Sequence, residues 1–186
     1  MNRRAFAALI AAGFLVACAP MADPNPIGRE ARAQLVFSQI EVVTTGAQFE
    51  SRAASDRASR LGPELRAALE QEFGDRRRAD GVRMVVEVSR VNLAGATRTA
   101  FGSDLSRLQG TVRVLAANGS LMGAYPIQVE AGTAAETRMG ALARAGVTSV
   151  DRFHRAMVAD FAREAREAIL GPDLPGQRLL RRATSG

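Results

Sequence analysis

The chain has 186 residues, 47% of them apolar and 24% charged, which is enough for one globular domain and too short for two large ones. It contains no lysine, which excludes a phosphate-binding loop lysine and Schiff-base chemistry. The formal net charge of +6 falls to about +4 without the first arginines, and this diffuse charge indicates no nucleic-acid partner.

The first twenty residues have the features of an export signal. Arg3 and Arg4 precede an uncharged apolar stretch over residues 5–17, which is too short for a stable membrane-spanning helix. The stretch ends in four residues that resemble the lipobox of bacterial lipoproteins: Leu15, Val16, Ala17 and Cys18. The resemblance implies that residues 1–17 are removed as a signal peptide and that Cys18 is acylated on its sulfur and on its new amino group, which anchors the protein in a membrane.

Two alternatives concern the export signal itself. A plain secretory signal with an incidental cysteine is one, and export in the folded state is the other, because Arg3 to Phe6 resembles the twin-arginine motif. In the lipoprotein pattern an aspartate after the cysteine retains the protein in the inner membrane. Ala19 stands there instead, which implies a location at the outer membrane, facing the periplasm.

Acylation of Cys18 would leave no thiol, because it is the only cysteine. A disulfide, a thiolate metal site and a cysteine nucleophile are therefore excluded. One histidine without cysteine ligands makes a zinc site improbable, and we expect no cofactor.

Residues 18–33 contain Pro20, Pro24 and Pro26 and predict an extended tether. Residues 34–171 form the expected single domain, and residues 172–186 a flexible basic tail. Within the domain, the apolar run 35–43 predicts a strand covered on both faces. Residues 55–73 predict a helix with one apolar stripe, ended by Gly74.

The second half of the domain begins with a strand over residues 82–93, whose alternation changes phase and so predicts a bulge near residues 89–90. Asn118 and Gly119 predict the turn of a hairpin with arms over residues 105–116 and 121–130. Pro126 lacks an N–H, so its strand is expected at an edge or with a bulge.

The last expected element is a helix that starts at Ser149 and ends before Gly171 and Pro172. On its exposed face we expect pairs four residues apart, Asp151 with Arg155 and Arg163 with Glu167.

These elements predict an α+β fold in the order β-α-β-β-β-α. We expect one mixed, mostly antiparallel, four-stranded sheet with two main helices packed on one face. The first two strands are expected to be parallel and joined by a right-handed crossover. The layout resembles small uncharacterised proteobacterial lipoproteins. It is also similar to the auxiliary lipoprotein of lipid-transport ABC systems and to the amino-terminal domain of the TolB envelope protein. The resemblance implies no catalytic residue.

Candidate chemical groups are few. His154 is expected on the solvated surface beside the apolar stripe of the last helix. Paired carboxylates in or beside strands could serve a hydrolase, although acidic residues on a wet sheet face are commoner; they are Glu41, Glu87, Asp104 and Glu130. Two basic clusters could contact an anionic lipid: Arg76, Arg77 and Arg78, and Arg181 with Arg182.

The sequence therefore favours a non-enzymatic envelope lipoprotein, an assembly or transport accessory that binds a protein or lipid partner. The partner surface is expected at the edge near Pro126 or in residues 131–148. A carboxylate-based cell-wall hydrolase and a small-ligand carrier remain as alternatives.

Overall fold

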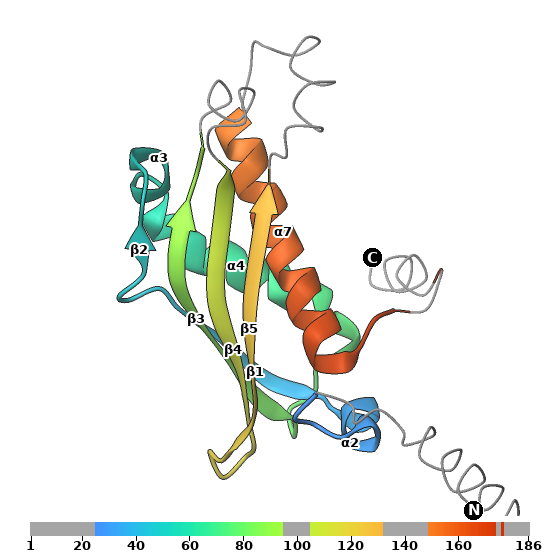
Figure 1. The fold of residues 1–186 in the computed structure, drawn as a ribbon. Coiled ribbons are helices and arrows are strands. Elements are labelled where there is room, and N and C mark those ends of the chain that lie inside the picture. The colour runs from blue at the N-terminus through green and yellow to red at the C-terminus, as the bar shows by residue number, and fades with distance from the viewer. Residues whose placement is uncertain (1–24, 95–104, 132–148, 174–175, 177–186) are drawn as a thin grey trace, which may run out of the picture.

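The chain folds into one curved sheet with helices on one of its faces (Figure 1). This is a computed structural model, and it describes residues 25–94, 105–131, 149–173 and 176. The elements, in chain order, are α2 (Arg29–Gln34), β1 (Phe37–Val43), β2 (Gln48–Phe49), α3 (Arg52–Ser55), α4 (Ala58–Glu72), the 3-10 turn η1 (Gly74–Arg76), β3 (Val82–Asn92), β4 (Ser106–Leu115), β5 (Leu121–Ala131) and α7 (Ser149–Leu170). The predicted α+β class is confirmed, as is the order of the main elements.

The sheet has the strand order β1-β3-β4-β5. β1 is parallel to β3, while β3, β4 and β5 are antiparallel neighbours, so the mixed, mostly antiparallel sheet is confirmed. In the residues that the structure describes, the sheet has five strands and not four, because β2 pairs with the far end of β3 through Gln48 and Arg90. A strand of two residues is too short to leave a pattern in the sequence.

The bulge predicted in the second long strand is confirmed, since the pairing of β3 with β4 shifts register between Val88 and Arg90. The shift keeps Val88 and Val91 both on the buried face, although they are three residues apart. Pro126 lies in β5 at the edge of the sheet, also as predicted.

Both main helices cover the same face of the sheet, which confirms the predicted packing. α4 contacts β1, α7 contacts β4 and β5, and the two helices contact each other. The largest fully buried side chains between the layers are Phe37, Leu61, Leu65, Leu69, Phe73, Met84, Leu108, Met157, Phe161 and Ile169. Phe37 and Phe73 meet edge to face at 5.0 Å between ring centroids, which joins β1 to the end of α4.

The segment before β1 differs from the extended tether predicted over residues 18–33. Its described part is packed on the domain: Ile27 is buried, and α2 follows directly. The Asn25 side-chain amide donates to the Ala168 carbonyl at 2.7 Å, and its oxygen accepts from the Tyr125 hydroxyl at 2.9 Å. The expected boundary at residue 34 therefore moves to Asn25 or earlier. The prolines of this segment could not predict its docking, because the residues that it contacts, in β5 and α7, are distant in the sequence.

Among the described helices none is both long and apolar enough to cross a bilayer. The lipobox, Asp104, residues 132–148, Arg181 and Arg182 lie outside the described residues.

Candidate functional site

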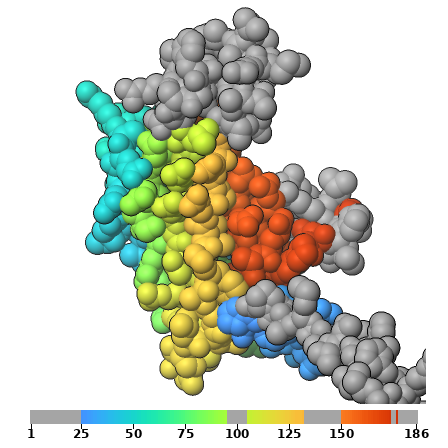
Figure 2. Space-filling view, viewed as in Figure 1, coloured from blue at the N-terminus to red at the C-terminus, as the bar shows by residue number. Residues whose placement is uncertain are grey.

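The face of the sheet opposite α4 and α7, called the open face below, carries no described helix (Figure 2). Side chains alternate along each strand, so the residues between the buried positions point to this face. They are Glu41 and Val43 on β1; Arg83, Val85, Glu87, Arg90 and Asn92 on β3; Arg107, Gln109, Thr111 and Arg113 on β4; and Ala124, Pro126, Gln128 and Glu130 on β5.

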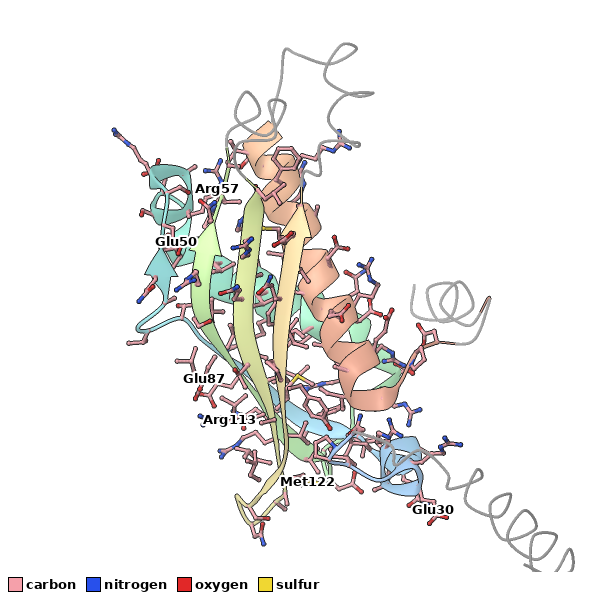
Figure 3. All side chains as sticks on the ribbon, in the orientation of Figure 1. Glu30, Glu50, Arg57, Glu87, Arg113 and Met122 are labelled. Atoms are coloured by element: carbon pink, nitrogen blue, oxygen red, sulfur yellow. The ribbon has the colours of Figure 1, made fainter. Side chains whose placement is uncertain are left out.

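Cross-strand pairs hold the polar side chains of the open face in place. Glu87 and Arg113 form an ion pair at 3.1 Å between β3 and β4, and both are labelled in Figure 3. Arg107 and Glu130 pair at 2.7 Å between β4 and β5. Half-exposed pairs of this kind contribute about 0.2–1 kcal/mol each. Their main effect is to fix the positions of charge on a rigid surface.

β5 forms one edge of the open face, and no described strand pairs with its outer side. In the described part of the chain no strand takes the backbone hydrogen bonds on that side, and Pro126 has no N–H to offer. The sequence expectation of a partner surface near Pro126 is compatible with this exposed edge, and the neighbouring residues 132–148 are outside the described residues.

The carboxylates considered for hydrolysis are not arranged across a cleft. Register and strand spacing put Glu87 and Glu130 roughly 16 Å apart at their Cα atoms. Glu41 and Glu87 lie on adjacent strands and are closer, roughly 8 Å apart. Both belong to the open face, however, and Glu87 is engaged by Arg113. Nothing in the described part therefore encloses a sugar ring between two carboxyl groups.

His154 is buried, with 3% of its surface exposed, so the expectation of a solvated histidine is wrong. Its Nε2 lies 2.5 Å from the Glu64 carboxylate on α4, and its Nδ1 has no hydrogen-bond partner in the described residues. α7 contacts α4 as well as the sheet, so its buried arc is wider than one stripe and includes position 154. The pair ties the two helices together at their interface, away from the open face.

The first basic cluster, Arg76 to Arg78, lies next to the α2 segment, at the end of the domain where the described chain begins. Arg76 donates to the Ala33 carbonyl of the α2 segment at 2.7 Å, and Arg78 pairs with Asp80 at 3.2 Å. Arg77 is exposed and has no described ion-pair partner. Two of the three guanidinium groups are thus already engaged, and Arg77 is the member of the cluster that is available to an anion.

A shallow depression of about 560 Å³ lies beside this cluster. It is lined by Ser38, Gln39, Ala79, Asp80, Gly81, Arg83, Ala116, Ala117, Asn118 and Gly119. The lining is mostly polar, whereas a carrier of apolar small molecules needs an enclosed apolar cavity. Among the described residues no group of three or more histidine, cysteine or acidic side chains is placed to hold a metal ion.

Comparison with known proteins gives little further information. No family model matches the chain, and neither does any curated protein. A solved structure of a PelC dodecamer from Paraburkholderia phytofirmans is similar at 10% sequence identity, covering 75% of this chain and 91% of that one, with a TM-score of 0.34. Agreement at that level carries no functional argument.

Proposed function

We propose that the protein is an outer-membrane-anchored periplasmic lipoprotein without catalytic activity, and that it serves as an assembly or transport accessory by binding an envelope protein through its open face. The observation that carries the proposal is this helix-free sheet surface, joined to a chain whose sequence has a lipobox ending at Cys18. The open face supplies the binding surface, and the lipid anchor determines where that surface works.

The size of the open face suits a protein partner. Strands of about ten residues at ~3.3 Å per residue, spaced ~4.8 Å apart, give a surface of roughly 35 Å by 15–20 Å. Each partner of a standard protein complex contributes about 800 Å². A partner would therefore use most of this surface, together with the exposed edge of β5.

The chemistry of the open face indicates a polar partner. Ion pairs and amide pairs alternate with small apolar side chains such as Val85 and Ala124, so no large apolar patch is available. The Gln109 amide donates to the Gln128 side chain at 2.6 Å, and both could instead bond to a partner. Recognition through such groups favours specificity over raw affinity, which suits a protein already concentrated at a membrane by its anchor.

The test is site-specific photo-crosslinking in intact cells. A photoreactive phenylalanine is placed at Ala124 or Gln128 on the open face, and at Arg66 on α4 or Glu164 on α7 as matched exposed controls. We expect a discrete adduct with one envelope protein from the two sheet positions and none from the helices. Adducts from the helix positions alone would refute the use of the open face.

The anchor is tested separately by labelling cells with a fatty-acid analogue. We expect the native chain to be labelled and the Cys18→Ser variant to remain unlabelled. Unchanged labelling of Cys18→Ser would contradict the proposed acylation site.

A further inference from the structure

The chain enters the domain at residue 25, and we call this end of the domain the tether end. It is built from four segments. They are α2, the start of β1, residues 76–82, and the turn between β4 and β5. Pairing places them together: Phe37 lies opposite Val82, and Leu115 lies opposite Leu121. Figure 1 shows α2 and the turn of the β4–β5 hairpin both at the lower end of the molecule.

The tether end carries exposed arginines that form no ion pair within the described part of the chain. Arg29, Arg77 and Arg83 are exposed, and none has an ion-pair partner among the described residues. Arg83 also lines the shallow depression, as does Asn118 of the hairpin turn. A guanidinium group suits phosphate because it donates two parallel hydrogen bonds. Three free guanidinium groups at one end of the domain therefore form a surface that fits anionic phosphates.

The same end exposes an apolar side chain. Leu121 is 58% exposed, and it is the large apolar residue that the described part of the chain leaves in contact with solvent. It is the first residue of β5, directly after the turn that contains Gly119 at φ +82°. An apolar side chain that projects from a turn beside arginines matches the boundary between lipid headgroups and acyl chains.

The length of the anchoring chain keeps this end near the bilayer. Asn25 comes seven positions after Cys18, and even a fully extended chain spans roughly 25 Å between them. Asn25 is itself fixed, through bonds to Ala168 on α7 and Tyr125 on β5. The domain is thus held by its tether end, and a weak affinity for lipid is enough to orient it because the anchor makes the local lipid concentration high.

We propose that the tether end docks on the anionic headgroups of the membrane that holds the Cys18 anchor. Arg29, Arg77 and Arg83 contact lipid phosphates, and Leu121 enters the headgroup boundary. The inference rests on the proposed lipid anchor. It adds an orientation, in which β5 starts at the bilayer and runs away from it, so that the open face stands upright and remains accessible to a partner.

The absence of tryptophan provides a clean reporter, because a single introduced tryptophan is the only indole in the chain. Acylated full-length mature protein carrying Leu121→Trp is reconstituted into phosphatidylcholine vesicles with and without phosphatidylglycerol. Gln48→Trp on β2 is the control, since β2 pairs with the opposite end of β3. With phosphatidylglycerol we expect a blue-shifted emission from Leu121→Trp that brominated lipid quenches, and no quenching of Gln48→Trp. Equal quenching at both positions, or none at Leu121→Trp, would overturn the docking.

Charge reversal tests the role of the arginines and guards against insertion driven by the introduced tryptophan alone. In the Leu121→Trp background, Arg77→Glu with Arg83→Glu is compared with Arg52→Glu, an exposed arginine on α3. Each arginine near an anionic surface changes partitioning roughly fivefold. We therefore expect the double variant to lose quenching and its salt dependence, and Arg52→Glu to keep both. Equal loss in the two variants would overturn the proposal.

The outcomes are distinguishable from failure of the proposed function. Mass spectrometry of the starting protein reports the acyl chains, so a missing anchor is detected before any vesicle is used. A partner adduct on the open face is measured in cells and does not depend on tryptophan quenching. Docking can therefore fail while the accessory function stands, and the reverse also holds.

Discussion

Arg166 and Asp75 form a partly buried ion pair that joins α7 to the end of α4, and its two partners should respond unequally to mutation. The guanidinium group bonds both Asp75 oxygens, at 2.8 and 2.9 Å, and donates to the Glu72 carbonyl at 2.9 Å. It also lies 5.6 Å from the centroid of the Phe73 ring. The Arg166 side chain is 6% exposed and that of Asp75 is 38% exposed. Asp75 can regain water when its partner is lost, whereas Arg166 cannot.

Asp75→Asn leaves a buried guanidinium group without its anion, and we expect a loss of about 3 kcal/mol in unfolding free energy. Arg166→Met removes the charge and keeps the volume of the stem. This variant loses the charge-assisted hydrogen bond to the Glu72 carbonyl and the contact with the Phe73 ring. Together these losses should lower the unfolding free energy by about 1–2 kcal/mol. Asp75→Asn should therefore be the more damaging change, and the double variant should resemble Arg166→Met.

Urea unfolding followed by far-ultraviolet circular dichroism measures these differences. The control is Arg163→Met, because Arg163 and Asp160 pair at the same 2.8 Å but are 35% and 32% exposed. We expect a change within about 0.5 kcal/mol for this control. If Arg166→Met proved at least as costly as Asp75→Asn, the reasoning from unequal exposure would be wrong.

Two further predictions concern single contacts. The hydrogen bond and charge of Arg57 lower the pKa of Asp151 below its ordinary value of 3.8; the ionised carboxylate therefore stabilises the fold above about pH 4, and this stability is lost as the pH falls further. Asp151→Asn should reduce the unfolding midpoint at neutral pH, and its difference from the native chain should shrink as the pH falls below about 4; a constant difference at all pH values would contradict this. Gly81→Ala would put a Cβ 2.5 Å from the Val36 carbonyl oxygen, so β1 and β3 must separate. We expect the unfolding free energy to fall by about 1–3 kcal/mol. The control is Gly46→Ser, because Gly46 has a positive φ but no atom within 4 Å of an added Cβ, so this variant has backbone strain without a clash.

The sequence predicted the sheet well because its strands are half-buried. Alternating side chains mark such a strand directly, and the change of phase in residues 82–92 could only be reconciled by an extra residue. Asn118 and Gly119 marked the hairpin because Gly119 adopts a positive φ that few residues tolerate. The parallel pairing of β1 with β3 followed from the helix between them.

Contacts between elements distant in the sequence could not be predicted in the same way. The pairs expected along α7 differ in the structure: Asp151 bonds Arg57 of the neighbouring segment at 2.7 Å, and Arg163 pairs with Asp160. Helical spacing shows which charges could meet on one helix, but not which charge a second helix brings closer. The burial of His154 was missed for the same reason.

The candidate binding surfaces were likewise predictable only in part from the sequence. The arginine cluster was visible as a run of three residues, but only the fold shows that Arg76 and Arg78 are engaged and that Arg29 and Arg83 join Arg77 at the tether end. Strict alternation along β5 would put Leu121 on the same side as Tyr125, which is buried, yet Leu121 projects into solvent at the start of the strand, where the pairing shifts register between Val114 and Leu115. A register shift at a hairpin end depends on both strands, and the alternation of one strand does not contain it.

The docking of residues 25–34 has the widest consequence for function. An extended tether to residue 33 would allow about 50 Å between bilayer and domain, whereas a chain that is fixed at Asn25 allows about half of that. With the proposed anchor at Cys18, a domain held so closely would reach partners at the membrane surface and not across the periplasm. Because Asn25 bonds both α7 and β5, the short reach depends on the stability of the fold itself. Loss of those bonds would lengthen the tether and weaken the orientation of the open face without any change in the anchor.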